Sequence, residues 1–176
     1  MKRRAVFLVL AAMLAVSFVA AEDNQPSGGS QSGTQQSKKA DPRVEETLKR
    51  LGVHYTVNTS GNVAVTYDLD GGRSQTVYIM SKTDEYNNVE IREIWSNAGT
   101  FDAEPDADGL INLMTESGKN KIGCWALEKQ DDGKYLLFYT IKMPAESSDE
   151  AYRMALEFAS AVADACEKEL FNSDEN

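Results

Sequence analysis

Residues 121–143, KIGCWALEKQDDGKYLLFYTIKM, decide the fold of this chain. Two runs rich in aromatic and branched residues, 121–128 and 135–143, flank the polar turn 130–134 with its Asp132-Gly133 step. Apolar runs on either side of an Asp-Gly turn are a strong signal for a β-hairpin. The stretch therefore predicts two antiparallel strands joined by a tight turn.

A long amphipathic helix is predicted directly after this hairpin. Ser147 and Glu150 have the spacing of a capping box, which marks a helix start, and the helix extends to about Leu170. Its apolar face recurs at helical spacing and comprises Tyr152, Ala155, Leu156, Ala159, Val162, Ala163, Cys166 and Leu170. Because several of these residues are small, we expect the helix to pack closely across the hairpin.

The chain before the hairpin predicts two more helices and four strands. Asp41 and Pro42 open a helix that ends at Gly52. Alternating apolar residues predict strands at 55–57, 63–67, 75–80 and 89–95. The alternation breaks near Ile94, which indicates a bulge or an edge position. A further helix is expected from about residue 110 to Gly118.

The element order is therefore α-β-β-β-β-α-β-β-α, which is typical of an α+β fold with an antiparallel sheet and helices on one face. Residues 41–171 are enough for a single domain with its own core. Most strand aromatics are expected in that core, but a sheet covered on one side leaves its other face for association. These aromatics are Tyr67, Tyr78, Trp95, Trp125, Phe138 and Tyr139.

The second half of the chain resembles the YbjN family and its relatives, whose fold is similar to that of type III secretion chaperones. The resemblance rests on residues 110–114, 120–127 and 131–136, on the proline-ended strand 139–144 and on the capped final helix. It implies a dimeric, non-catalytic module with a sensory or chaperone-like role.

The N-terminus has the pattern of a cleaved signal peptide. An apolar run follows the basic residues Lys2, Arg3 and Arg4, and small residues precede a predicted cleavage site after Ala21. Residues 1–21 therefore predict export to the periplasm or beyond the cell. No membrane association is expected after cleavage, because the run is short for a membrane span. Classical secretion chaperones act in the cytoplasm. Export therefore argues against that role for this chain.

Two polar segments are predicted to flank the domain. Residues 22–40 are rich in Gly, Ser and Gln, a composition that favours a disordered linker. Residues 172–176 are expected to form a flexible C-terminal tail. The sequence thus predicts one folded domain between two unstructured segments.

The chain is strongly acidic, with 18 Lys and Arg residues against 28 Asp and Glu residues. The signal peptide holds three of those basic residues, so 15 remain against 28 after cleavage. Binding to nucleic acid or anionic lipid depends on phosphate neutralisation by Lys and Arg. The charge therefore argues against both as partners and favours a soluble protein or one with a basic partner.

The sequence lacks the motifs of a common active site. His54 is the single histidine, no nucleophile elbow is present, and no glycine-rich phosphate loop occurs. Carboxylates are abundant, but their spacing does not single out an acid and a base. We therefore expect no enzymatic activity and no cofactor.

An acidic segment is a weak candidate for a metal site. Glu104, Asp106 and Asp108 alternate before Gly109, which matches the first half of a calcium loop. The twelfth position, however, is Thr115 rather than a bidentate carboxylate. The alternative is that Asp106 or Asp108 caps the following helix, where its dipole favours acidic groups.

Cys124 and Cys166 are the two cysteines of the chain. An even number in an exported protein permits one disulfide. Cys166 lies on the apolar face of the final helix and Cys124 in a strand which that helix could cover. The alternative is that both are free thiols in apolar surroundings.

Together these features predict an exported, non-enzymatic protein-binding module, either chaperone-like or a sensory adaptor. It would bind a protein partner or a second copy through a sheet face or a sheet edge. The alternative function is a periplasmic protein that binds a small ligand or calcium, in the groove between helix and sheet or at residues 104–109.

Overall fold

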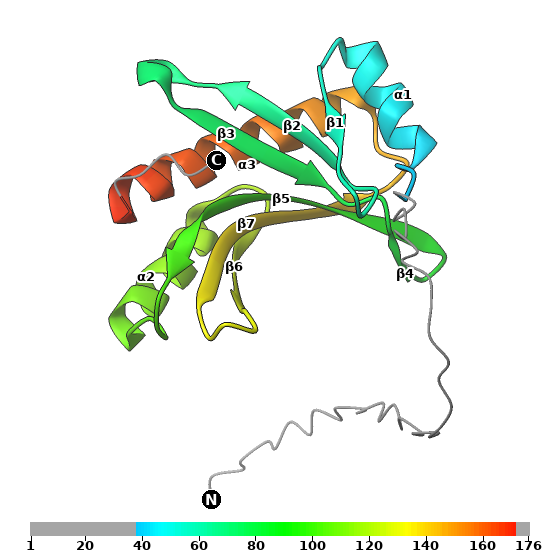
Figure 1. Cartoon of the computed structure of the whole chain (residues 1–176). Coiled ribbons are helices and arrows are strands. Elements are labelled where there is room, and N and C mark those ends of the chain that lie inside the picture. The colour runs from blue at the N-terminus through cyan, green and yellow to red at the C-terminus, as the bar shows by residue number, and fades with distance from the viewer. Residues whose placement is uncertain (1–37, 172–176) are drawn as a thin grey trace, which may run out of the picture. The chain divides into compact units, whose positions relative to one another are not determined.

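The computed structural model describes residues 38–171, which form an antiparallel sheet with three helices (Figure 1). This confirms the predicted α+β class. The elements are α1 (Pro42–Leu51), β1 (Thr56–Val57), β2 (Val63–Asp68), a short 3-10 turn (Asp70–Gly72), β3 (Ser74–Ile79), β4 (Asp84–Tyr86), β5 (Val89–Phe101), α2 (Ala107–Lys119), β6 (Cys124–Lys129), β7 (Tyr135–Pro144) and α3 (Asp149–Leu170). The short β4 is the element that the sequence did not predict.

The strands follow the order β1-β2-β3-β5-β7-β6, and β4 pairs with β5 beside this path. The longest ladder joins β5 to β7, from the pair Ile91 and Pro144 to the pair Phe101 and Tyr135. β5 is therefore an interior strand and not an edge. Its bulge lies between Asn97 and Gly99, further along the chain than the predicted break near Ile94.

One face of the sheet carries the core and is covered by α3, which runs behind β2 and β3 in Figure 1. We call this side the covered face; Val77, Ile94 and Tyr139 lie on it and are fully buried. α1 packs beside α3 and adds Val44 and Leu48 to the same core. A single apolar layer thus lies between the sheet and the two helices.

The helix α3 begins one residue later than the capping-box spacing predicts. The Ser148 hydroxyl is its N-cap and accepts a hydrogen bond from the Ala151 N–H at 3.2 Å, whereas Ser147 donates to the Pro144 carbonyl. The small residues Ala155 and Ala159 are buried against the sheet, as expected. Their size lets the helix axis approach the strands closely.

The folded part of the chain begins before the predicted end of the linker. Ala40 is buried in the core, and the Lys38 N–H donates to the Thr59 carbonyl at 3.3 Å. The predicted signal peptide (1–21), most of the predicted linker (22–40) and the predicted tail (172–176) lie outside the described residues. Among residues 38–171, no helix combines the length and apolar character needed to cross a bilayer.

A fully buried arginine explains why the alternation in β5 breaks. Arg92 lies on the covered face between Glu90 and Ile94, a position where the pattern calls for an apolar residue. Its guanidinium contacts Asp41 Oδ2 at 2.6 Å and donates to the Tyr152 hydroxyl at 3.0 Å. It also donates to the carbonyls of Met80 and Ser81. The group is thus hydrogen-bonded on several sides, as a buried charge must be.

Asp41 joins this buried arginine to the start of α1. Its carboxylate caps the helix by accepting from the Arg43 N–H at 2.9 Å and also pairs with the Arg43 guanidinium. Arg43 in turn reaches Glu90 and Glu146. Hydrogen bonds from Arg43 and then Arg92 hold the pKa of Asp41 well below its usual range, although burial opposes them.

We expect Ala159→Leu to destabilise the protein by about 1–3 kcal/mol, because the larger side chain has no space between α3 and the sheet. Glu157→Leu, on the exposed side of the same helix, should change stability by less than about 0.5 kcal/mol. Urea midpoints of the two variants and the parent measure the difference. Equal midpoints would contradict the packing of α3 described above.

We expect Asp41→Asn to lower the free energy of unfolding at pH 7 by about 3 kcal/mol, since it leaves the buried Arg92 charge without its carboxylate. A lowered pKa in the folded state contributes stability above the unfolded value near 4, and this contribution is lost as the pH falls further. The variant should therefore lose less stability than the parent between pH 5 and pH 2.

Urea unfolding at several pH values measures this difference, with Glu157→Gln as the control because Glu157 is exposed on α3. The control should follow the parent at every pH. If the Asp41→Asn and parent curves ran parallel down to pH 2, Asp41 would not contribute to the acid sensitivity.

Candidate functional site

Three aromatic side chains lie together on the side of the sheet opposite α3, which we call the open face. The ladders pair Tyr78 with Trp95, and Asn97 with Phe138, so alternation places Tyr78, Trp95 and Phe138 on this same side. The rings of Tyr78 and Trp95 stack with centroids 4.5 Å apart, and Phe138 meets Trp95 edge-on at 5.5 Å. We call these three residues the aromatic ladder.

The aromatic ladder is only half buried, although it occupies the middle strands of the sheet. The Trp95 indole N–H donates to the Met80 sulfur at 3.3 Å. Beside it, the Thr140 hydroxyl donates to Glu93 Oε1 at 2.6 Å. The centre of the open face is therefore a preformed apolar surface. Each ring pair stabilises this arrangement by about 0.5–1.5 kcal/mol.

Further apolar side chains are exposed at two places that lie at opposite ends of β5 (Figure 1). On α2, Ile111 is 58% and Met114 is 75% exposed, and no residue of this helix is buried. At the tip of the β4–β5 hairpin, Tyr86 is 72% and its cross-strand partner Val89 is 44% exposed. Each pair is a small exposed apolar patch of its own, separate from the aromatic ladder.

The helix α2 also protects an edge of the sheet. β6 is the last strand in the sheet order, so one side of its backbone lacks a strand partner. The Ser117 hydroxyl of α2 accepts the outward Trp125 N–H at 2.9 Å. α2 thus covers part of the β6 edge through its half-buried side, while Ile111 and Met114 point away.

The candidate calcium segment forms a helix cap. Asp106 is the N-cap of α2, and its Oδ1 accepts from the Gly109 N–H at 2.7 Å. Glu104 and Asp108 are exposed beside it. In residues 38–171, no three acidic, cysteine or histidine side chains converge as a metal site would require. The capping alternative therefore describes Asp106.

The two cysteines are free thiols in the structure. Cys124 pairs with Thr140 in the β6–β7 ladder, which places its side chain on the open face. Cys166 belongs to α3 on the other side of the sheet, where burial raises the pKa of its thiol to about 12. The disulfide that the sequence permits is not formed, because the sheet separates the two side chains.

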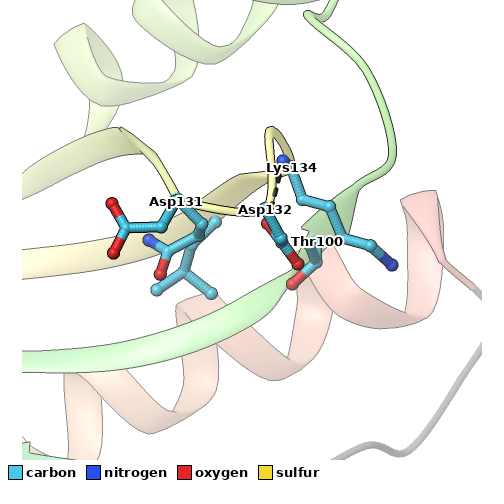
Figure 2. Close-up of a pocket in the computed structure, with 6 residues that line it drawn as sticks. Thr100, Asp131, Asp132 and Lys134 are labelled. Carbon is cyan, nitrogen blue, oxygen red and sulfur yellow. Dashed lines mark hydrogen bonds between the residues drawn. The ribbon is translucent and has the colours of Figure 1, made fainter.

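A polar hollow of about 550 Å³ lies at the β6–β7 turn (Figure 2). Its lining includes Thr100, Asp131, Asp132 and Lys134. Figure 2 shows the carboxylates of Asp131 and Asp132 extending away from each other. Asp132 accepts from the Lys134 N–H at 3.0 Å, as in a simple turn, and Lys134 also pairs with Asp102. Asp132 and Lys134 are therefore used in the turn and in a surface ion pair.

His54 and the remaining strand aromatics lie outside the aromatic ladder. His54 is exposed after the end of α1. Tyr139 is fully buried, while Tyr67 and Trp125 are half buried against the core on the covered face. The sequence predicted a core with one uncovered sheet face but left the register open. The ladder pairs are what separate the aromatic ladder from the core aromatics.

The sequence matches no protein-family model, and no curated protein matches it. Among solved structures, the chain is similar to the crystal structure of YbjN from E. coli, with a TM-score of 0.42 and 12% sequence identity. The similarity covers 73% of this chain and 90% of that chain. It is a remote relationship of fold and concerns the fold alone.

We expect Asp106→Ala to destabilise the protein by about 1 kcal/mol, because α2 loses its N-cap hydrogen bond. Asp106→Ser should restore most of that loss, since a serine hydroxyl can accept the same N–H. Urea midpoints measure both effects. A melting temperature that rose with added calcium in the parent but not in Asp106→Ser would instead support a metal site.

Proposed function

We propose that the protein is an exported, non-enzymatic protein-binding module that acts through the aromatic ladder on the open face. The observation that carries this proposal is the position of Tyr78, Trp95 and Phe138, which stack on each other while remaining half exposed. Tryptophan and tyrosine are enriched among the residues that dominate binding energy at protein interfaces.

The open face favours a flat protein partner over a small molecule. A small ligand is usually enclosed in a cavity, whereas the aromatic ladder lies on the broad surface of three adjacent strands. Two sheets pack face to face about 10 Å apart, with their side chains interdigitated. A second sheet or a helix would therefore cover the aromatic ladder most completely.

A second copy of the chain is the partner that we propose first. Glu93 and Lys142 are cross-strand neighbours on the open face, so a two-fold arrangement can bring opposite charges together. After signal cleavage, 15 basic residues stand against 28 acidic ones, and this net charge of −13 opposes such a dimer at long range. Salt screens that repulsion, and self-association should therefore strengthen between low and physiological ionic strength.

Trp95→Thr should strongly weaken association, because it removes the central ring and keeps a residue that suits a strand. The parent should show a concentration-dependent increase in mass by light scattering, and the variant should remain monomeric at the same concentrations. Loss of one central aromatic residue weakens an interface by about 2 kcal/mol or more, roughly a 30-fold change in the dissociation constant.

Tyr55→Thr is the matched control, since Tyr55 is a half-buried aromatic residue that bonds to Glu45 beside α1 and not on the open face. This variant should associate as the parent does. A parent that stays monomeric at high concentration and retains no protein from a periplasmic fraction would overturn the proposal.

A further inference from the structure

The strand β7 has a stretch of edge that β6 does not cover. The β6 ladder ends at the pair Cys124 and Thr140, but β7 continues to Pro144 and pairs there with β5 alone. Gly123 causes this ending. It adopts φ of 76°, and a side chain at this position would meet the Thr140 carbonyl at 2.5 Å. The chain before β6 therefore turns away, and Ile122 receives a hydrogen bond from the Tyr139 hydroxyl instead.

Alternation shows which backbone groups lie on this uncovered edge. The Trp125 N–H points out of the sheet to Ser117, so Cys124 and Ala126 are the β6 residues that face β7. Their partners Thr140 and Phe138 face back toward β6. Two residues beyond Thr140, the N–H and C=O of Lys142 must face the same side, where residues 38–171 provide no strand.

A groove of about 310 Å³ runs between this edge and α3. Its walls are mainly apolar and include Ile141, Met143, Met154 and Ala155. Met154 is 49% exposed, so one wall is accessible from solvent. An unpaired strand edge next to an apolar groove is the arrangement in which proteins add an extended peptide as an extra strand.

Lys142 is the charged residue that borders the groove. In the β5–β7 ladder it pairs with Glu93, so its side chain leaves the edge on the open face, opposite α3. Its side chain is exposed and forms no ion pair with any residue in the described part of the chain. This is an unpaired cation in an otherwise acidic protein, with 28 acidic against 18 basic residues. A carboxylate on the bound peptide would complement it.

We infer that this groove is a second binding site, which takes an extended peptide segment with apolar side chains and a carboxylate. The peptide pairs with the Lys142 backbone as an added strand. On the covered face its apolar side chains lie against Met143 and Met154, and on the open face its carboxylate meets the Lys142 ammonium. The groove lies outside the aromatic ladder and shares only Lys142 with the surface proposed for self-association, and the inference does not depend on that proposed function.

The test is a random decapeptide library panned against the purified protein, once with free C-termini and once with C-terminal amides. We expect enriched peptides with alternating apolar residues. Enrichment in the free-acid library alone would identify a chain terminus as the source of the carboxylate. Enrichment of Asp or Glu in both libraries would identify a side chain as its source.

The best peptide is then labelled with fluorescein and titrated by anisotropy against three variants. Lys142→Pro removes the edge N–H and should weaken binding at least about tenfold, whereas proline is tolerated on a strand edge. Lys142→Gln retains the backbone and should weaken binding less, with a reduced salt dependence. Met154→Glu places a charge on an exposed wall of the groove, so it should weaken binding without destabilising the fold. This variant keeps the test valid if Lys142→Pro does not fold.

Trp95→Thr separates this site from the aromatic ladder. That variant should lose association but bind the peptide as the parent does. Unchanged affinity for both folded Lys142→Pro and Met154→Glu, or no enrichment over a library panned on Met154→Glu, would overturn the inference. Loss of peptide binding in Trp95→Thr alone would assign the peptide to the open face instead.

Discussion

The burial of the Arg92 charge is the constraint on which the rest of the structure depends. A guanidinium removed from water must be paired and hydrogen-bonded, or it costs several kcal/mol. Here its partners come from three distant segments: Asp41 before α1, the Met80 and Ser81 carbonyls after β3, and Tyr152 in α3. Each partner is in place only when its element is docked. The arginine therefore couples the first helix, the sheet and the last helix into one cooperative unit.

The β6–β7 hairpin and α3 were predictable because each depends on local signals, namely a turn sequence and an apolar stripe. The α+β class followed from their order. The break in β5 was placed wrongly because Arg92 looks like a surface residue until Asp41, 51 positions earlier, is known to neutralise it. Distant ion pairs leave no periodic signal in a sequence.

The open face was predictable in kind but not in its residues. One long helix cannot cover both sides of a sheet, so an uncovered side was expected. Which aromatics lie there depends on a register that a single residue's slip would reverse. In the structure, the pairing of Tyr78 with Trp95 settles the register of β3 against β5 and places both rings away from α3. The separation of Cys124 from Cys166 follows from the same register.

The hydrogen bond from the Trp125 N–H to Ser117 bears on the tendency of the protein to aggregate. A bare strand at the end of a sheet is a template onto which further chains can stack without limit, the geometry that leads to fibres. α2 lies over that strand although none of its own residues is buried. The helix adds little to the core. Its position blocks part of the β6 edge, which opposes the addition of further strands there.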